Sequence, residues 1–495
     1  MRFVQILEEP IEPGGLVEWT PFVPGGLGAW DRDARLTSHN HEQHLRSAFE
    51  YRARTRLAGG RESWLGVSIT IAGPLSIPAL RATLRTWIDR HEVLRSHVVI
   101  KYDGLARLTT APGTVKLRMG RIGWYRESGP LVEQLAGSFD RATAPLQWPA
   151  YLFATVGRES SFTLLFAADH SLVDGYSLIM AQHELTEIYR AHRDHREVVL
   201  PAVGSYVDFS AAERRAADQA GADHPAVAAW TGFLDAGDGR MPQLSASLPA
   251  PPDEAPPAPN TQVSPAPKTP LSPMPAAQMS RSGVLADDAT AERFAQECAA
   301  AGGSLTAGVL AVLAIVAHEL GGDPDFRCVL PRHTRDGAQW LTALGWFVAV
   351  APFCLDMSDD PSFAEAVPRA AAELTRARQG ASLPLERVAG LIGLSGGPRF
   401  AVSFIDTRRA PGAAEADAGR ATVLRSHSYS PDEIFIWINR TPCGLRFSTR
   451  FPAYLAAVDA GRPPIAEPPG TIVPGTGVVA DLLRGFADFV RRRVG

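Results

Sequence analysis

The stretch FAADHSLVDGYS, residues 166–177, decides the fold that we expect for this chain. Its apolar run gives way to Asp169 and His170, and Asp174 and Gly175 follow within five positions. Beyond Gly175 apolar residues return at helical spacing, so His170 is predicted to lie in a turn between a strand and a helix. A turn on a rigid scaffold can direct such a side chain into a cleft.

Two interpretations of this turn are open. In the first, His170 accepts a proton near neutral pH, and Asp174 returns to the same turn four residues later. Gly175 then permits a backbone angle or a close approach that a side chain would block. In the second, the turn only caps the following helix, with Asp174 accepting hydrogen bonds from backbone amides.

The totals describe an ordinary globular protein. Its 495 residues exceed what one hydrophobic core usually serves, so two domains are expected. A formal net charge of -4, from 49 basic and 53 acidic residues, gives no reason to expect a nucleic-acid partner. The cysteines lie far apart, without a C-x-x-C pair, which predicts reduced thiols and no metal site: Cys298, Cys328, Cys354 and Cys443.

Neither the N-terminal segment nor the longest apolar run indicates a membrane protein. The opening MRFVQILEEPIEPGG lacks a long apolar stretch and predicts a first strand, not a signal peptide. The longest apolar run, residues 305–320, is too short for a spanning helix and predicts a buried core helix. We therefore expect a cytoplasmic protein without a transmembrane segment.

One segment divides the chain. Residues 249–275 carry eleven prolines and no aromatic residue, which is typical of an extended, solvated linker. A ligand for a proline-binding module is the alternative. The predicted organisation is an N-terminal lobe over residues 1–240, a Pro-rich linker over 241–281 and a C-terminal lobe over 282–495.

Both halves mix strands and helices, which predicts an α/β fold for each. Residues 64–73 alternate like a half-buried strand, and residues 151–169 predict a hairpin. In the second half, helices are expected near 288–301 and at 305–320. Further strands are expected at RCVLP, WFVAVAPFCL, RFAVSFID, IFIWINR and LRFSTRF.

Two groups of histidines are candidate metal ligands. His91 and His97 lack the H-E-x-x-H spacing, so a structural role in the N-terminal lobe is expected. His39, His41 and His44 form a cluster that either binds a metal or lines a polar helix face. We expect the polar face.

Several motifs in order resemble those of one enzyme superfamily. HSLVDGYS (170–177) resembles the H-H-x-x-x-D-G-W-S signature of condensation domains and related CoA-dependent acyltransferases. RHEVLRSHV (90–98), SYVDFS (205–210) and LGWFVAVAPF (344–353) resemble their R-H-x-x-L-R, Y-x-D-Y and G-x-F-V-N motifs. The opening ILEEPIEPGGLVEW and FIWINR make the polyketide-associated (Pap-type) acyltransferases of actinobacteria the most similar group. Further matching segments are 38–45, 139–153, 383–388 and 399–406.

The resemblance implies a fold and a set of roles. Two chloramphenicol-acetyltransferase-like lobes are expected to form a V, with a tunnel between them and the histidine turn at its centre. His170 matches the catalytic histidine of the motif, and Gly175 and Ser177 match other motif positions. Asp174 matches the structural aspartate, for which Arg335 is the candidate partner from the other lobe and Arg332 the competing one.

Asp169 is a departure, because the family has its first motif histidine there. This carboxylate either raises the pKa of His170 or faces a polar network on the core side. Candidate tunnel residues are Trp346 and Phe347, which are alternatively core residues. Ser403 and Asn439 are polar positions on otherwise apolar strands and are further candidates to face the acceptor.

The function implied is transfer of an acyl group from a CoA or carrier-protein thioester to an acceptor hydroxyl, in lipid or polyketide-type natural-product biosynthesis. The alternatives are an amide-forming, free-standing condensation enzyme of nonribosomal peptide assembly and a non-catalytic scaffold that binds a carrier protein. No permanently bound cofactor is expected. An acyl or peptidyl carrier protein or a polyketide synthase is the expected partner, and the protein is expected to be a monomer.

Overall fold

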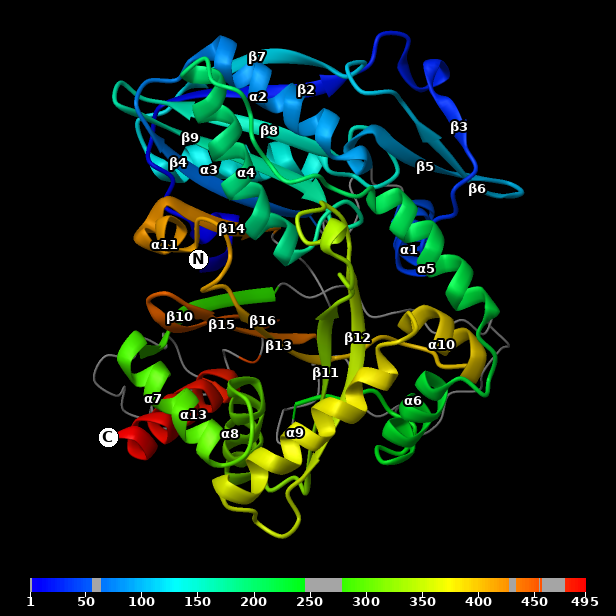
Figure 1. Cartoon of the computed structure of the whole chain (residues 1–495), viewed down its shortest axis with the longest axis vertical. Helices are drawn as coiled ribbons and strands as arrows, with labels where there is room; N and C mark the ends of the chain where they lie inside the picture. The colour runs from blue at the N-terminus through cyan, green and yellow to red at the C-terminus, as the bar shows by residue number, and fades with distance from the viewer. Residues whose placement is uncertain (1, 56–63, 245–277, 427–432, 454, 456–476) are drawn as a thin grey trace, which may run out of the picture.

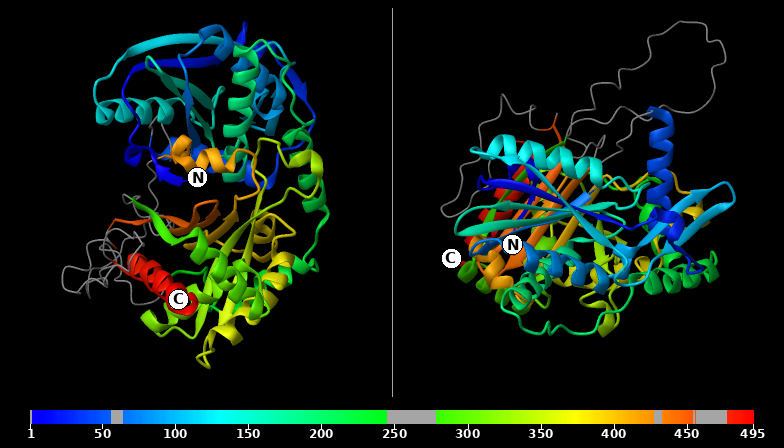
Figure 2. Two further views of the ribbon diagram at one scale, coloured as in Figure 1. Left: turned by 60° about the vertical axis from the view of Figure 1, so that its left-hand side comes forward. Right: turned by 90° about the horizontal axis from the view of Figure 1, so that it is seen from above.

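A computed structural model describes residues 2–55, 64–244, 278–426, 433–453, 455 and 477–495. Two lobes lie one above the other, each with helices packed on a sheet (Figures 1 and 2). α5 (Tyr206–Gln219) runs along one side of the molecule from the first lobe toward the second (Figure 1). We call the boundary where the two lobes meet the seam.

The first lobe is built on a seven-stranded sheet of order β1-β14-β4-β9-β8-β2-β7. The helices α2 and α4 pack on one face of this sheet, and α3 packs on the opposite face. The strands are β1 (Arg2–Gln5), β2 (Gly15–Phe22), β4 (Trp64–Ala72), β7 (Lys116–Trp124), β8 (Tyr151–Gly157), β9 (Ser161–Asp169) and β14 (Ala421–Arg425). The helices are α2 (Ile77–Arg90), α3 (Ser128–Ala142) and α4 (Gly175–Arg193).

The second lobe is built on a six-stranded sheet of order β10-β16-β15-β13-β11-β12. Its core lies between one face of this sheet and the helices α7, α8, α9 and α13. The strands are β10 (Gln278–Asp287), β11 (Asp325–His333), β12 (Val348–Asp356), β13 (Phe400–Asp406), β15 (Ile434–Thr441) and β16 (Gly444–Pro452). The helices are α7 (Asp288–Ala300), α8 (Leu305–Gly321), α9 (Phe363–Gly380) and α13 (Val478–Val494).

Smaller elements complete the two lobes. A three-stranded sheet of order β3-β6-β5 extends the first lobe. Its strands are β3 (Asp31–Asp33), β5 (Ser96–Lys101) and β6 (Gly104–Thr109), and the remaining helices are α1 (His39–Thr55), α6 (Pro225–Asp235), α10 (Leu385–Ile392) and α11 (Ala413–Glu415). Short 3-10 turns lie at Ile6–Glu8, Gly26–Ala29, Glu92–Arg95 and Ala338–Trp340, and a π turn lies at Ala416–Arg420.

The elements form where the sequence pattern predicts them. Val67, Ile69 and Ile71 alternate along β4 and bury in the first-lobe core. α2 turns Leu84 and Trp87 toward the same core, as a helical period of apolar residues requires. The predicted helices at 288–301 and 305–320 are confirmed as α7 and α8, and the five predicted strands as β11, β12, β13, β15 and β16.

No single helix among the described residues combines the length and hydropathy needed to cross a bilayer. α7 and α8 satisfy such a test only as a pair, and they are bent by 92° relative to each other. The middle of α8 is buried in the second-lobe core, as predicted for this apolar run.

The lobes are not divided cleanly along the sequence. β14, which follows the second-lobe strand β13, lies in the first sheet between β1 and β4. α6 packs against α9 and β12, although the predicted N-terminal lobe includes it. Of the predicted linker over 241–281, residues 245–277 lie outside the described residues. Its last four residues, from Gln278, belong to β10 because they already pair with β16.

Candidate active site

The histidine turn lies where β9 ends and α4 begins, as the sequence predicts. β9 closes at Asp169, and the Leu172 amide donates to the Asp169 carbonyl at 2.9 Å to form a tight turn. Asp174 is the N-cap of α4, and its carboxylate accepts a hydrogen bond from the Ser177 amide at 2.7 Å. His170 therefore lies between β9 and α4, beside Trp346 from the segment before β12.

Asp174 is bound to the second lobe through Arg335, which follows β11. Nη1 and Nη2 of Arg335 donate to the two carboxylate oxygens of Asp174 at 2.7 and 3.0 Å. The side chains are 1% and 2% exposed, so the ion pair is almost completely enclosed. Burial by itself raises the pKa of Asp174, but the charge and hydrogen bonds of Arg335 outweigh it and lower the pKa. Arg335, not Arg332, is the partner.

Ser177 and Phe347 extend this contact. The Phe347 amide donates to Asp174 at 3.0 Å, and the Ser177 hydroxyl donates to the Gly345 carbonyl at 2.9 Å. Nη2 of Arg335 also donates to the Ser177 hydroxyl at 2.9 Å, and its guanidinium lies 4.3 Å from the centre of the Phe347 ring. These bonds fix the segment before β12 against the start of α4, which holds the lobes together beside His170.

His170 is partly exposed, so its ring is not sealed inside the protein. Its Nδ1 is buried and has no hydrogen-bond partner on another described residue. Nε2 is not among the buried, unpartnered atoms of the described residues. The ring of Trp346 lies 4.7 Å away, centre to centre. Asp174 makes no hydrogen bond to His170 in the described part of the chain, so its contacts serve the lobe junction.

Asp169 faces a polar partner that the sequence did not identify. Nε2 of His44, on α1, lies 3.0 Å from both carboxylate oxygens of Asp169. The Ser171 amide and hydroxyl also donate to Oδ1, at 3.0 and 2.5 Å. Both histidines lie beside Trp346. The centre of its ring is 5.8 Å from the ring centre of His44 and 4.7 Å from that of His170.

The charges around the turn set the proton affinity of both histidines. Burial lowers the pKa of His44, but the Asp169 charge and hydrogen bond raise it further, so the net shift is upward. Burial lowers the pKa of His170; its own main-chain carbonyl and Asp169 raise it, and the His44 charge lowers it, with a net downward shift. The net shifts favour the neutral ring of His170 and the protonated ring of His44 beside Asp169.

Gly175 does not have the role expected for it. Its backbone is not in the left-handed region, and a Cβ there would lie 3.5 Å from the Phe3 ring, an ordinary contact. The prediction that a Cβ is excluded is therefore wrong, because the turn is closed by Asp174 and the space beside Gly175 is open enough for a methyl group.

The predicted tunnel residues fall into two groups. Trp346 borders His170, whereas Phe347 is fully buried in the first-lobe core under Arg335. Ser403 and Asn439 are buried on β13 and β15, and they point away from the second-lobe core. Asn439 has a carbonyl oxygen without a partner among the described residues.

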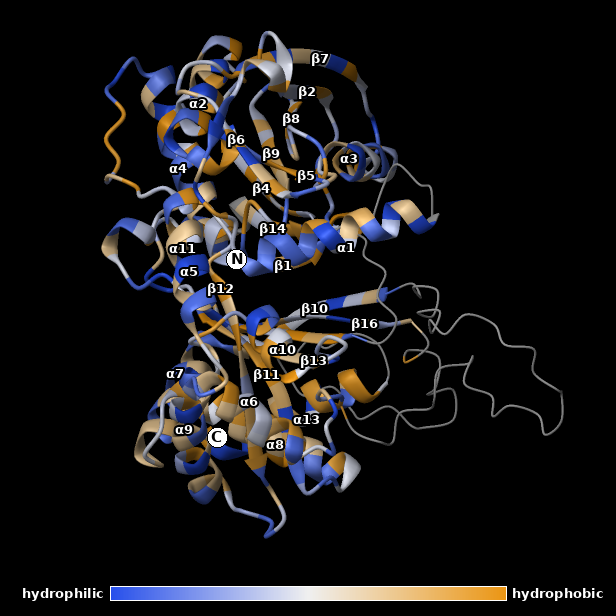
Figure 3. Ribbon diagram, turned by 90° about the vertical axis from the view of Figure 1, so that its right-hand side faces the viewer, coloured by the Kyte–Doolittle hydropathy of each residue, from blue (hydrophilic) through white to orange (hydrophobic). Residues whose placement is uncertain are grey.

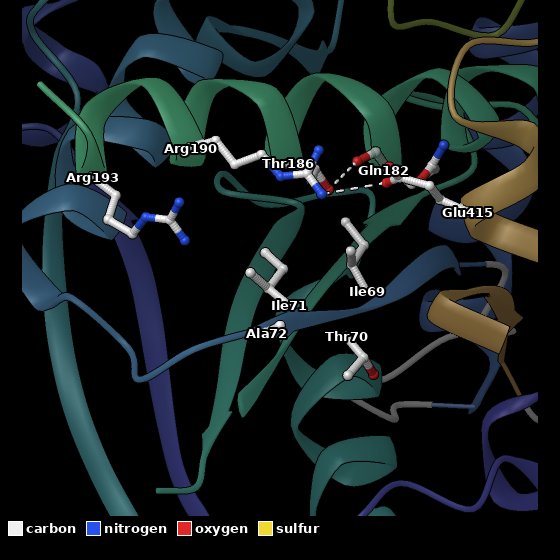
Figure 4. A pocket seen from close by; sticks show the side chains of 9 residues that line it. All are labelled: Ile69, Thr70, Ile71, Ala72, Gln182, Thr186, Arg190, Arg193 and Glu415. Atoms are coloured by element: carbon white, nitrogen blue, oxygen red, sulfur yellow. Dashed lines mark hydrogen bonds and ion pairs between the residues drawn. The ribbon is translucent and has the colours of Figure 1, made fainter. Parts of the chain in front are cut away.

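A cavity of about 130 Å³ lies away from His170, between β4 and the C-terminal half of α4 (Figure 4). Arg190 at its rim pairs with Glu187 and Glu415, at 2.7 and 3.4 Å, and so carries no free charge toward it. The passage past His170 that the family resemblance implies stays a prediction.

His91 and His39, from the two other histidine motifs, have protein partners, whereas Nδ1 of His41 is buried without a hydrogen-bond partner among the described residues. Glu184 on α4 binds His91 at 2.7 Å and Arg90 at 2.9 Å, which fastens α2 to α4. His39 pairs with Asp218 at 2.8 Å. Within the described residues no group of three or more histidines, cysteines and carboxylates is arranged to hold a metal ion.

Two α/β lobes with an imidazole in a strand-to-helix turn at their seam are the arrangement that the resemblance to condensation domains implies. The chain belongs to the condensation-domain family, whose Condensation domain model matches residues 57–399. Among curated relatives, acyltransferase PapA3 of Mycobacterium tuberculosis is 23% identical over 470 residues, covering 90% of this chain and 92% of that one. The 2'-acyl-2-O-sulfo-trehalose (hydroxy)phthioceranyltransferase PapA1 of the same species is 25% identical, covering 77% of this chain and 72% of that one.

Solved structures agree on the fold. The PapA2 acyl transferase matches all of both chains, with a TM-score of 0.82 and 20% identity. The first condensation domain of the calcium-dependent antibiotic synthetase matches 94% of this chain and 98% of that one, with a TM-score of 0.65 and 19% identity. Family membership together with the curated relatives identifies this chain as an acyltransferase.

Proposed function

We propose that the protein transfers an acyl group from a CoA or carrier-protein thioester to an acceptor hydroxyl, with His170 as general base. The observation that carries this proposal is His170 itself: a partly exposed imidazole at the seam, with Nδ1 enclosed and a lowered pKa. The relatives PapA1 and PapA2 are named as acyltransferases of sulfated trehalose, which supports a sugar hydroxyl as the acceptor.

The proposed reaction begins with Nε2 of His170, because Nδ1 is enclosed. Nε2 removes the proton of the acceptor hydroxyl while the oxygen attacks the thioester carbonyl carbon. The carbon–sulfur bond then breaks, and protonated His170 returns the proton to the departing thiolate. General-base assistance of this kind contributes about 10²–10⁴-fold to the rate, and holding both substrates at one seam adds further rate through proximity.

Asp174 and Arg335 serve this chemistry indirectly. Their pair fastens the second lobe to the turn that carries His170, so both lobes contribute walls to one site. The His44–Asp169 pair keeps a cation near His170, which favours the neutral, proton-accepting ring. A carrier protein or a polyketide synthase is the proposed source of the acyl group where free acyl-CoA is not used.

An amide-forming condensation enzyme is the second candidate, and it has the same requirement for a neutral His170. The observation in its favour is the structural match to a condensation domain of a peptide synthetase. The third candidate, a scaffold without turnover, is disfavoured because Asp169 has acquired a partner in His44 and so is not simply a decayed motif position.

An acceptor panel tests the proposal. The protein is incubated with palmitoyl-CoA and with palmitoylated carrier protein, alongside matched alcohols and amines, and thiol release is followed with product mass. Alcohol-dependent release with an ester product is expected, whereas amine dependence with an amide product selects the second candidate. The control is His183→Ala, a partly buried histidine on α4 that should keep wild-type release. Equal release by wild type and His170→Ala contradicts both enzymatic candidates.

A further inference from the structure

A second set of polar side chains lies on the seam, and the proposed reaction does not use it. Arg425 is the last residue of β14, and its guanidinium lies against Trp437 on β15 of the second sheet. Figure 3 shows β1 and β14 directly above β10 and β16. β1 contacts both of these second-lobe strands.

Arg425 is a buried guanidinium without a carboxylate partner among the described residues. It is 7% exposed; Nη2 donates to the Ser280 hydroxyl and, at 2.8 Å, to the Thr449 carbonyl. Nε and Nη1 are enclosed and have no partner in the described part of the chain. The guanidinium lies 4.7 Å from the centre of the Trp437 ring. Two nitrogens of a charged group are therefore buried without hydrogen bonds, which destabilises a folded protein.

Other unused polar groups gather on the same faces. Gln5 is the β1 neighbour of Arg425 in the sheet, and its enclosed side-chain nitrogen has no partner within the described ranges. Ser448 is opposite Trp437 in the pairing of β15 with β16, and its hydroxyl is likewise enclosed and unpartnered there. Amide nitrogen, guanidinium and hydroxyl are all hydrogen-bond donors.

Electrostatics at this place favour an anion. Burial, together with repulsion from Arg450, lowers the pKa of Arg425 to about 9, against a smaller attraction from Glu8. Arg450 is itself paired with Glu433 at 2.6 Å, whereas Arg425 makes no salt bridge among the described residues. An added negative charge would relieve both burial and repulsion.

We propose that Gln5, Arg425 and Ser448 form a subsite for an oxyanion, a sulfate, phosphate or carboxylate group carried by the acyl acceptor. This inference rests on the proposed function, because it assigns part of the acceptor. A planar guanidinium with two unpartnered nitrogens, Nε and Nη1, is suited to bind such a group through paired hydrogen bonds.

The distance from His170 selects the acceptor over the donor. Arg425 is beside Leu65 in the sheet, and Leu65 is beside Ala168, two residues before His170. Two strand spacings separate the main chains of Arg425 and Ala168, about 10 Å. An extended pantetheine arm spans roughly 15 Å from sulfur to phosphorus, at the reach per bond of an extended chain. The donor phosphate therefore lies beyond this subsite when its thioester is at His170.

Arg425 has a structural alternative, in which its contacts with Ser280 and Thr449 only clamp the lobes. Thermal unfolding in sodium sulfate and in sodium chloride at equal ionic strength separates the two. Sulfate stabilises most proteins in a gradual, unsaturable way, whereas a bound sulfate adds a saturable gain in Tm. The wild type is expected to show the saturable gain. Arg425→Met is expected to bind sulfate at least about tenfold more weakly, because a charge-assisted hydrogen bond is lost.

Arg95 provides the matched control. It is 5% exposed and also lacks a close carboxylate, but the Ile88, Thr110 and Asp89 carbonyls accept its hydrogen bonds. Arg95→Met is expected to lower Tm and to keep the saturable sulfate gain. No saturable gain in the wild type, or an equal gain in wild type and Arg425→Met, overturns the subsite and leaves Arg425 as a clamp.

Two further experiments ask whether the oxyanion belongs to the acceptor or to the donor, and whether the subsite can be judged apart from the proposed function. With palmitoyl-CoA as donor, the kcat/KM ratio of glucose 6-sulfate to glucose is expected to be tenfold or more, and near one in Arg425→Met. A ratio near one in the wild type refutes the acceptor assignment while acylation itself still stands. Coenzyme A that abolishes the sulfate gain assigns the subsite to the donor and also refutes it. If neither sugar is acylated, the proposed function fails for sugars, and the sulfate arm still decides whether the subsite exists.

Discussion

The two carboxylates beside His170 are held in different ways. Asp174 is bound across the seam by an arginine, whose charge is fixed at all ordinary pH values. Asp169 is bound within the first lobe by His44, whose charge depends on pH. The comparison indicates that one side of the turn joins the lobes permanently, while the other adjusts the electrostatics of His170 and can be titrated.

Replacing Arg335 should remove the contact of Asp174 with the second lobe and cause the largest loss of stability. Arg335→Met leaves Asp174 enclosed without its counter-charge, and breaking a buried pair in this way costs about 3–5 kcal/mol. Urea unfolding followed by tryptophan fluorescence measures the loss. Arg332→Met is the control, since Arg332 is not the Asp174 partner, and it should cost much less. Similar losses in the two variants would contradict the assigned role of Arg335.

Breaking the second side should have a smaller effect that depends on pH. His44→Gln removes a charged hydrogen-bond partner of Asp169, worth about 1.5–3 kcal/mol when fully formed. Because the pKa of His44 is raised on folding, its contribution is complete below the unfolded pKa near 6.5 and is lost as pH rises through the folded pKa. The stability difference between wild type and His44→Gln should therefore shrink from pH 6 to pH 9.

The Arg335→Met difference should not shrink over that pH range. In the wild type the lowered pKa of Asp174 keeps its carboxylate ionised throughout, whereas in the variant burial raises this pKa, so ionisation at higher pH adds to the loss. If the stability losses of Arg335→Met and His44→Gln changed with pH in the same way, the contacts of Asp174 and Asp169 would not differ as proposed.

The smallest expected effect is on the pH profile of thiol release. The pKa of His170 is lowered, so activity should be lost only as pH falls below about 6.5. His44→Gln removes a nearby cation and leaves the Asp169 charge, and both changes raise the pKa of His170. The acid limb of kcat/KM should move to higher pH in this variant. A limb that stays in place would mean that His44 acts on stability alone.

Much of the turn was predictable because its information is local. The apolar run of β9, the capping aspartate and the helical spacing of α4 place His170 without reference to distant residues. Arg335 was predicted from the family resemblance, although 161 residues separate it from Asp174.

The partner of Asp169 was not predictable in the same way. His44 lies 125 residues away on a helix with two other histidines, and nothing in the spacing separates it from His39 or His41. A carboxylate in place of a motif histidine was the available signal, because an acidic substitution in a core position calls for a basic partner.

The insertion of β14 was also outside the reach of local pattern. Its strand character is evident in Ala421–Arg425, but only the pairing with β1 and β4 shows that it belongs to the first sheet. Arg425 reaches the seam through that insertion. Sequence spacing assigns such a strand to the lobe that surrounds it in the chain, which is why this part of the seam was missed.

The kcat/KM of His170→Ala tests the central claim most directly. Thiol release from an acyl-thioester with an alcohol acceptor should fall about 10²–10⁴-fold. Urea unfolding should stay close to that of the wild type, because Nδ1 of His170 has no hydrogen-bond partner on another described residue. A variant that folds normally and keeps wild-type kcat/KM would show that His170 is not the base.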